Sequence, residues 1–361
     1  TKPALPPYEQ MEEQIREIFT TGQITNGKYV RMFEEQAAAY LGVDHVVAAP
    51  NATVGLMVVL STLPTGSEVI LPAYTFSATY QAVVWNGLRP VLAECDDSCN
   101  IDVAHAETLV SRNTSAILAV HMYGTPADVE GLERLSSRTN VRLFFDAAHA
   151  FGSKHKEVHV GGFGDAEVFS LGPTKTMPVG EGALIATRDR HVAEWIRKAC
   201  NHGQRPGTLE CDVKSVNGRL QEINGVVGLH LLKNVEQHVI RRNELASRYK
   251  QRLGGVPGMT FPHVPATARS TYKDFCIFVD PDGFGMTRDG LRAQLEQREI
   301  QTKLYFSPPI HQLAVAKDQF RGLSLPKTEQ LSSRVLALPL YSHMPFDEVT
   351  MVCDAIMECR G

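Results

Sequence analysis

Two residues at the ends of apolar segments could carry acid–base and nucleophilic chemistry. Asp146 closes the apolar run Leu-Phe-Phe-Asp, which has the composition of a buried strand. Ligands bind at the carboxyl ends of strands in open parallel sheets, so a carboxylate here would face a ligand, unless it only caps a helix. Lys175 follows in a Gly/Pro-rich turn between two further apolar segments. A lysine held against the sheet can lose its proton through burial and attack a carbonyl carbon; a solvated surface charge is the alternative.

A third feature, the segment Asn51-Ala52-Thr53, could bind phosphate. It stands between a predicted strand and a predicted helix. A helix N-terminus offers free backbone N–H groups and the positive end of the helix dipole to an anion. Pyridoxal phosphate needs a lysine for the Schiff base, a carboxylate that keeps the pyridine nitrogen protonated, and a phosphate cradle. The order and context of these residues therefore predict a pyridoxal phosphate site.

The elements that would position these residues alternate along the first half of the chain. Residues 8–41 have helical periodicity, broken by a loop at 21–27, and end at Gly42, a good helix stop. Strands are predicted at 45–50, 68–72, 90–95, 115–124, 141–150, 166–171 and 182–187, and helices between them at 53–63, 75–87 and 128–139. This alternation indicates an α/β fold with a mostly parallel sheet and helices on both faces.

The pattern changes after about residue 225. Residues 225–253 have the pattern of one long helix, and a Gly/Pro-rich break follows at 254–266. The remainder has the pattern of a smaller α+β domain, with a strand at 273–280 and helices at 289–299 and 347–360. We therefore expect a large pyridoxal phosphate-binding domain with an N-terminal arm at 1–230 and a small C-terminal α+β domain at 231–361.

Composition excludes several classes of protein. The 361 residues are 43% hydrophobic and 21% charged, with a net charge of −4, which excludes a disordered chain, a collagen, a coiled coil and a general nucleic-acid binder. No apolar run could span a bilayer, and the first residues contain no signal-peptide core. The seven cysteines form no metal-binding spacing, so we expect reduced thiols, no metal and a cytoplasmic protein.

Several motifs resemble the DegT/DnrJ/EryC1/StrS aminotransferases, which act largely on sugar nucleotides and cyclitols. The most specific are LPAYTFSAT, HMYGTPADVEGL, FFDAAHAFGS, FSLGPTK with GEGA, NGRLQEINGVVGLHLL and LALPLY. They occur in order from the ITNG of 24–27 almost to the C-terminus. The resemblance implies fold type I of the pyridoxal phosphate-dependent transferases, the fold of aspartate aminotransferase. It also implies a homodimer with active sites at its interface.

The resemblance implies roles for the residues around the cofactor ring. Lys175 matches the Schiff-base lysine and Asp146 the partner of the pyridinium nitrogen. His149 matches the side chain that contacts the cofactor's phenolic oxygen. Phe76 matches the aromatic residue that stacks on the ring, and a core aromatic side chain is the alternative.

Another group of matching residues would bind the phosphate. Ala52, Thr53 and Ser170 match its binding positions within one chain, and Asn217 matches an Asn delivered from the neighbouring subunit. The alternative for Asn217 is an N-cap of its own helix. Arg219 lies close by and is either a substrate contact or an ordinary surface charge.

On the substrate side the sequence departs from the family. Many members have His where this chain has Gly172, which removes a possible hydrogen-bonding group from the sugar side, and a second Gly where it has Ala183. Tyr305 and His311 match a segment near the substrate, and we expect them to be candidate substrate contacts.

These observations predict an enzyme that moves an amino group from glutamate or glutamine to a keto-sugar, with a nucleotide-linked keto-deoxy sugar as the expected acceptor. A cyclitol aminotransferase is an alternative. A sugar dehydratase is less consistent, because dehydratase relatives carry His in place of the Schiff-base lysine. A non-catalytic pyridoxal phosphate-binding regulator is a third alternative, which the intact Lys175, Asp146 and Thr53 disfavour.

Overall fold

A seven-stranded sheet forms the centre of the protein. The computed structural model describes residues 3–205 and 207–360. Within these residues the sheet has the order β1-β9-β8-β5-β4-β2-β3. Its strands are β1 (His45–Ala49), β2 (Glu68–Pro72), β3 (Arg89–Ala93), β4 (Thr114–Val120), β5 (Arg142–Asp146), β8 (Ala166–Ser170) and β9 (Ala183–Thr187). Only β9 runs against the other strands, because both of its pairings are antiparallel. The predicted mostly parallel sheet is confirmed.

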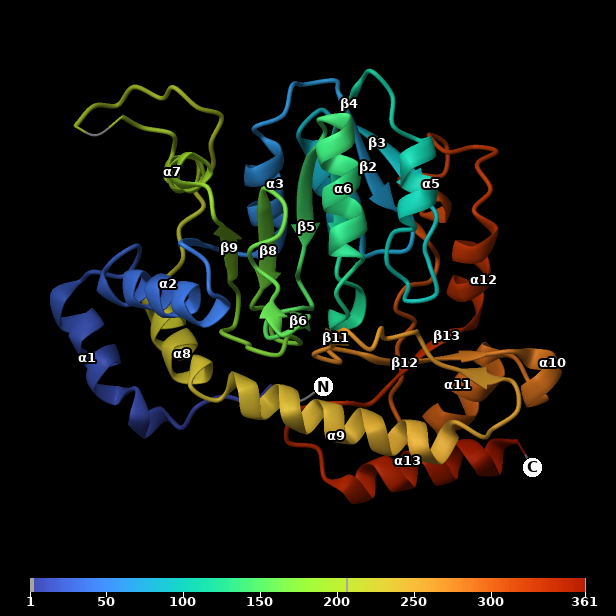
Figure 1. Cartoon of the computed structure of the whole chain (residues 1–361). Coiled ribbons are helices and arrows are strands. Elements are labelled where there is room, and N and C mark those ends of the chain that lie inside the picture. The colour runs from blue at the N-terminus through green and yellow to red at the C-terminus, as the bar shows by residue number, and fades with distance from the viewer. Residues whose placement is uncertain (1–2, 206, 361) are drawn as a thin grey trace.

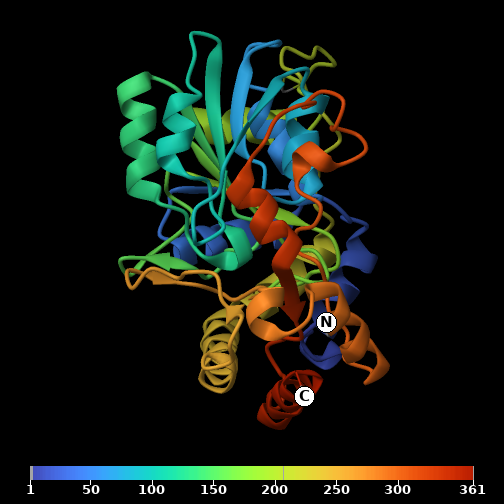
Figure 2. The ribbon, with the colours of Figure 1, turned by 90° about the vertical axis from the view of Figure 1, so that its right-hand side faces the viewer.

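Helices cover both faces of this sheet, as the alternation predicted. Side chains of a strand alternate between faces, so Val69 and Leu71 lie in one core cluster and Ile70 in another. The first cluster packs under α3 (Ala52–Leu60), α4 (Ser77–Trp85) and α7 (Arg190–Ala199). The second packs under α5 (Val103–Thr108) and α6 (Val129–Thr139). Figure 2 shows the sheet between these two helical layers.

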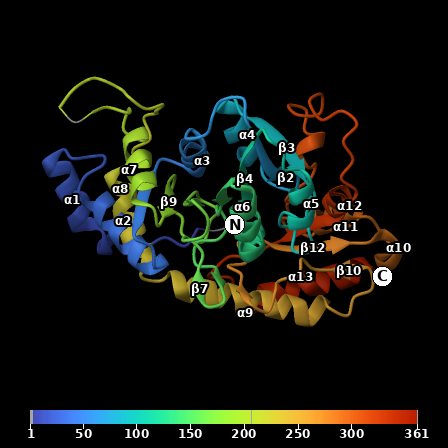
Figure 3. The same cartoon turned by 45° about the horizontal axis from the view of Figure 1, so that its top comes forward.

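The N-terminal segment packs on the β1–β9 side of the sheet (Figure 3). It contains a 3-10 turn (Tyr8–Gln10), α1 (Glu12–Thr21) and α2 (Lys28–Leu41), and α2 lies against α8 (Glu222–Leu232). The two helices approach closely because α8 carries glycine at the contact. A Cβ atom on Gly228 would come within 2.6 Å of the Phe33 ring.

The C-terminal part of the chain builds a smaller α+β unit with its own core. Its three-stranded sheet has the order β10-β12-β13. The elements are α9 (Val235–Leu253), β10 (Met259–Thr260), β12 (Phe275–Val279), α10 (Pro281–Phe284), α11 (Arg288–Gln297), α12 (Pro326–Arg334), β13 (Val335–Leu338) and α13 (Phe346–Cys359). Figure 1 shows α9 and α13 running side by side beneath this sheet.

Short elements complete the chain. A small sheet joins β6 (Lys154–His155), β7 (Val158–His159) and β11 (Ala268–Arg269), and two 3-10 turns lie at Met122–Gly124 and Ile310–Gln312. No helix among the described residues is both long enough and apolar enough to cross a bilayer. All seven cysteines are free thiols.

The single helix predicted at 225–253 is wrong. The chain forms α8 and α9 instead, which meet at Lys233 and Asn234. Figure 1 shows why: α8 packs beside α2, whereas α9 belongs to the small unit and runs beneath its sheet. Tertiary packing bends the chain at a point where no proline marks the break. The predicted domain boundary at 230/231 falls within the last turn of α8 and stays a prediction.

Candidate active site

A cavity of about 150 Å³ opens at the edge of the sheet where the parallel strands end. Because β1 also runs with them, the chain that follows it reaches the same edge. Of the residues singled out from the sequence, the cavity wall contains Ala52, Thr53, Phe76, Asp146, His149, Ser170 and Lys175. Strands far apart in sequence therefore bring these residues to one place.

The start of α3 forms one corner of the cavity. The Asn51 side chain caps the helix by accepting a hydrogen bond from the Val54 amide at 2.9 Å. The amides of Ala52 and Thr53 precede that bond, and no described residue accepts a hydrogen bond from either. Ser170, at the end of β8, also lines the cavity. Two free N–H groups, a hydroxyl and the helix dipole can hold a phosphate here.

Asp146 is buried at the end of β5. One carboxylate oxygen accepts a hydrogen bond from the Thr79 hydroxyl at 2.8 Å, and the other accepts from the Ala148 amide at 3.1 Å. Burial raises the pKa of Asp146, and these two donors act in the opposite direction. No described residue forms an ion pair with this carboxylate. Asp146 is thus a buried acceptor suited to a cationic N–H group.

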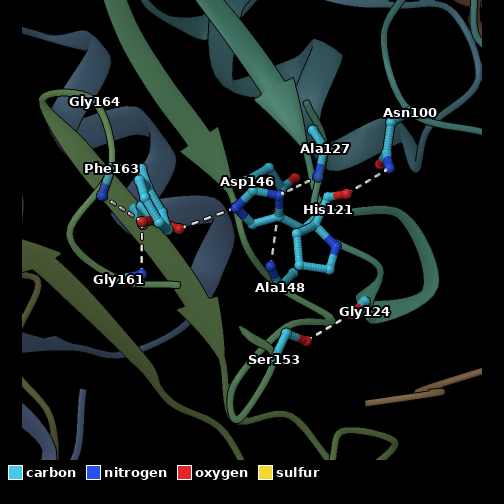
Figure 4. A network of polar contacts seen from close by, with 12 residues as sticks. Asn100, His121, Gly124, Ala127, Asp146, Ala148, Ser153, Gly161, Phe163 and Gly164 are labelled. Carbon is cyan, nitrogen blue, oxygen red and sulfur yellow. Dashed lines mark hydrogen bonds and ion pairs between the residues drawn. The ribbon is translucent and has the colours of Figure 1, made fainter. Parts of the chain in front are cut away.

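A buried network fixes the backbone beside Asp146 (Figure 4). The backbone amide of His121 donates to the Asp146 carbonyl oxygen at 3.0 Å. The His121 ring accepts from the Ala127 amide through Nδ1, so its proton lies on Nε2, which contacts Glu167 at 3.0 Å. Glu167 also accepts two backbone N–H bonds from the 161–163 turn. Every polar atom of this pair is used, so the end of β5 is held rigidly.

Lys175 lies in the turn between β8 and β9 and lines the cavity. Its backbone amide bonds to the Gly172 carbonyl at 3.0 Å, which shapes the turn. Burial, with a smaller effect from the positive charge of Lys273, lowers the pKa of Lys175 to about 8. Among the described residues, none hydrogen-bonds to its amine. The lysine is therefore neutral more often than an ordinary lysine at the same pH, and no described residue competes for its amine.

Two aromatic groups and a histidine form the remaining walls. His149 Nδ1 accepts from the Tyr123 amide at 3.2 Å, so the neutral ring carries its proton on Nε2. Burial lowers the pKa of His149 well below its ordinary value. Its ring stacks on Phe306 with 6.2 Å between centroids, and Phe76 lies 5.8 Å from the same Phe306 ring. Phe76 precedes the first residue of α4 and is 56% exposed, so it does not form part of the core.

Four predicted residues lie outside this cavity. Asn217 is exposed on the loop before α8. The residue at the N-cap position of α8 is Gln221, so the alternative that Asn217 caps the helix is wrong. Arg219 lies near it and bonds to Asn201 at 3.4 Å. Tyr305 lines a neighbouring cavity, adjacent in sequence to Phe306. His311 is buried and bonds to Glu329 at 3.1 Å.

Sequence reasoning did not single out Thr75, Glu181 and Phe306, which line the cavity, or Thr79, which hydrogen-bonds to Asp146. Thr79 lies four residues after Thr75, a helical spacing that would have placed the two hydroxyls on one face. Glu181 belongs to the GEGA motif, and no local pattern indicates that its side chain reaches the cavity. Phe306 lies far from the other residues in sequence, and no local pattern indicates that it reaches the cavity.

The departure at Gly172 leaves space beside the cavity. Its backbone is not in the left-handed region, and an added Cβ would lie 3.6 Å from Ser170 Oγ and 4.0 Å from a Glu181 oxygen. Neither contact is a clash, so the backbone does not require glycine. Ala183 begins β9 within the core and packs there without contacting the cavity.

This sheet, with a buried carboxylate, a lysine and an anion-binding helix N-terminus at one edge, defines the class of fold type I pyridoxal phosphate-dependent transferases. The chain belongs to the DegT/DnrJ/EryC1/StrS aminotransferase family, whose sequence profile matches residues 8–357. It is an aminotransferase, as the motifs predicted.

Individual relatives agree with this assignment. The chain is 31% identical over 366 residues to the dTDP-4-amino-4,6-dideoxy-D-glucose transaminase of Escherichia coli, covering 99% of this chain and 97% of the relative. The crystal structure of DesI, solved in the presence of its TDP-sugar product, superposes with a TM-score of 0.92 at 31% identity, covering 99% and 91% of the two chains. The crystal structure of NtdA from Bacillus subtilis, with bound cofactor PMP, superposes with a TM-score of 0.88 at 26% identity. The match covers 98% of this chain and 82% of NtdA.

Proposed function

We propose that this protein transfers an amino group from glutamate or glutamine to a nucleotide-linked keto-sugar, using pyridoxal phosphate. The observation that carries the proposal is the single cavity shared by Lys175, Asp146 and the N-terminus of α3. The sugar-nucleotide relatives indicate the acceptor class. A keto-inositol acceptor is the alternative within the same chemistry.

The residues present fit the cofactor. The uncommitted Ala52 and Thr53 amides, with Ser170, match a phosphate. The buried Asp146 carboxylate has no cationic partner among the described residues, which suits a protonated ring nitrogen. When bound, pyridoxal phosphate supplies an electron sink for the carbon that loses or gains the amino group.

Each residue of the cavity then has a defined task. With the cofactor bound, Asp146 would stabilise a positive charge on the ring nitrogen, and Phe76 would supply an aromatic surface for the ring. His149 directs its Nε2 proton into the cavity as a hydrogen-bond donor. Lys175 would provide the amine that holds the cofactor, and the same amine, once free, could carry a proton to and from the substrate carbon. A general base of this kind works best with a pKa near the working pH, and the pKa of Lys175 is about 8.

The second subunit of a homodimer would complete the site. Neither Asn217 nor Arg219 lines the cavity of its own chain, and we propose that they serve the partner's site. Tyr305 and His311 stay predictions as substrate contacts.

Borohydride reduction tests the assignment of Lys175. Reduction of the cofactor-loaded protein followed by peptide mapping should leave the pyridoxyl label on Lys175. Lys175→Arg should fold and carry no label, because Arg stays protonated and forms no imine. A label on Lys154, Lys156 or Lys214 would contradict the proposal.

A half-reaction screen tests the acceptor. The protein converted to its pyridoxamine phosphate form by glutamate or glutamine is mixed with nucleotide keto-sugars and with keto-inositols. Return of the absorbance near 400 nm with a nucleotide keto-sugar supports the proposal. If the absorbance returns only with a keto-inositol, the acceptor is a cyclitol and not a nucleotide keto-sugar. An absorbance band that never responds to an amino donor would indicate a non-catalytic pyridoxal phosphate-binding protein.

A further inference from the structure

The side-chain environment of Asp146 contains one feature that the reaction does not explain. Thr79 on the first turn of α4 is fully buried (0% exposed), and its hydroxyl donates to Asp146 Oδ2 at 2.8 Å. The other carboxylate oxygen has only a backbone donor, the Ala148 amide at 3.1 Å. Thr79 is therefore the one side chain among the described residues that hydrogen-bonds to this carboxylate.

The direction of the next hydrogen bond follows from this one. The hydroxyls of Thr75 and Thr79 lie 2.9 Å apart, and both side chains are buried. An ionised carboxylate can only accept, so the Thr79 proton is committed to Asp146. Thr75 must then donate to Thr79. A directed pair of hydroxyls thus leads from the cavity wall, which Thr75 lines, to the carboxylate.

The charged and titratable groups around Asp146 do not replace this contact. Lys175 faces it from the turn after β8, and His121 from the end of β4, but neither side chain hydrogen-bonds to the carboxylate. His149, in the turn after β5, uses Nδ1 for the Tyr123 amide. A buried carboxylate with so few donors depends strongly on each of them, because an unmet charge inside a protein is costly.

We propose that Thr79 is a positioning residue that holds Asp146 ionised and aligned before the cofactor arrives, with Thr75 fixing the direction of the Thr79 hydroxyl. This inference rests on the proposed function. The carboxylate must be charged to pair with a protonated ring nitrogen, and the hydroxyl favours the charged form. Loss of the hydroxyl favours the neutral carboxyl group of Asp146. As the pH is lowered, the variant should therefore lose its affinity for the cofactor at a higher pH than the parent does.

The test compares hydroxyl-retaining and hydroxyl-deleting variants in the dissociation constant for pyridoxal phosphate between pH 5 and 9. Thr79→Val keeps the shape and removes the hydroxyl, whereas Thr79→Ser keeps the hydroxyl and removes the methyl group. We expect Thr79→Val to bind about tenfold more weakly at pH 7, with the pH midpoint of binding raised by about one unit. Thr79→Ser should stay within about twofold of the parent. If Thr79→Val does not fold, Thr79→Ala against Thr79→Ser makes the same comparison.

Two results would overturn this inference and leave the proposed function untouched. One is a hydroxyl-deleting variant that keeps the parent's affinity and pH midpoint. The other is an equal change in the Ser variant, which would indicate packing rather than hydrogen bonding. A parent protein that binds no pyridoxal phosphate at any pH would instead overturn the proposed function, and this inference with it.

Discussion

At the scale of single residues, burial sets the protonation of the lysine that faces the cavity. The pKa of Lys175 falls from the ordinary 10.5 to about 8. The neutral amine is the nucleophile, so its reactivity should rise as the pH passes upward through 8.

The rate of covalent capture measures this pKa. We expect apo-protein mixed with pyridoxal phosphate to develop absorbance near 400 nm with a rate whose pH midpoint is about 8. Lys175→Arg controls for reaction at other lysines and should show no fast phase. A midpoint near 10.5 would mean that the lysine is solvated before the cofactor binds.

Asp146 is the second residue whose chemistry follows from its place. Asp146→Asn removes the charge that favours a protonated ring nitrogen, and turnover should fall by at least about 100-fold, equivalent to about 3 kcal/mol of transition-state stabilisation. Asp165→Asn is a matched control. Asp165 lies just before β8, at the end of the strands away from the cavity, and its carboxylate accepts a hydrogen bond from Arg142. Its replacement should leave turnover within about twofold of the parent. Parent-like turnover in Asp146→Asn would refute the role.

The sequence could predict Asp146 and Lys175 because each stands at the end of an apolar run, where parallel strands place ligand-binding groups. It could not predict Thr79 or Phe306. No local pattern distinguishes Thr79 from other helical residues, because its partner Asp146 lies 67 residues away in the sequence, at the end of β5. Phe306 enters through a chain segment that returns from the small unit to the edge of the sheet.

At the scale of elements, one carboxylate joins two helices. Glu222, the first residue of α8, is buried and accepts three backbone N–H bonds at the start of α2: from Gly27 and Tyr29 at 2.7 Å each and from Val30 at 3.1 Å. The contact satisfies the amides that open a helix without an intrahelical partner. It ties the N-terminal arm to the helix that follows Asn217.

Removal of this cap should loosen the arm. We expect Glu222→Ala to lower the free energy of unfolding by about 3 kcal/mol, because three buried amides lose a charged acceptor. Glu13→Ala, on the exposed face of α1, is the control and should change it by less than about 0.5 kcal/mol. Urea unfolding followed by circular dichroism measures both, and equal stabilities for the two variants would contradict the capping role.

Most elements were predictable because their periodicity is strong, and the errors occur where tertiary contacts decide. The strand predicted at 115–124 ends at Val120, since Tyr123 adopts a positive φ of 57°. That conformation is held by the bond from its amide to His149, a partner that no local pattern reveals. The break between α8 and α9 has the same origin, because the two helices pack on different units.

At the scale of the whole molecule, large apolar side chains are exposed on the N-terminal arm and on α8, the helix that follows Asn217. Phe19 and Ile24 of the arm are 73% and 61% exposed, and Ile223 of α8 is 37% exposed. The arm and α8 are adjacent, since Thr25 pairs with Gln221 and α1 contacts α8. Large exposed apolar side chains on adjacent elements are typical of protein interfaces. A homodimer would bury them and bring Asn217 to the neighbouring cavity.

Subunit mixing distinguishes a shared site from an independent one. Lys175→Ala and Asn217→Ala proteins should each be inactive or nearly so as homodimers. If each site takes its lysine from one chain and its Asn from the other, a mixed dimer has one site with both lesions and one with neither. Random exchange at equal concentrations makes half of the dimers mixed, so about a quarter of the parent's activity should return. If both residues act within one chain, every site keeps a lesion and mixing restores nothing. No recovery, with exchange verified by mass spectrometry of differently tagged subunits, would place Asn217 outside the partner's site.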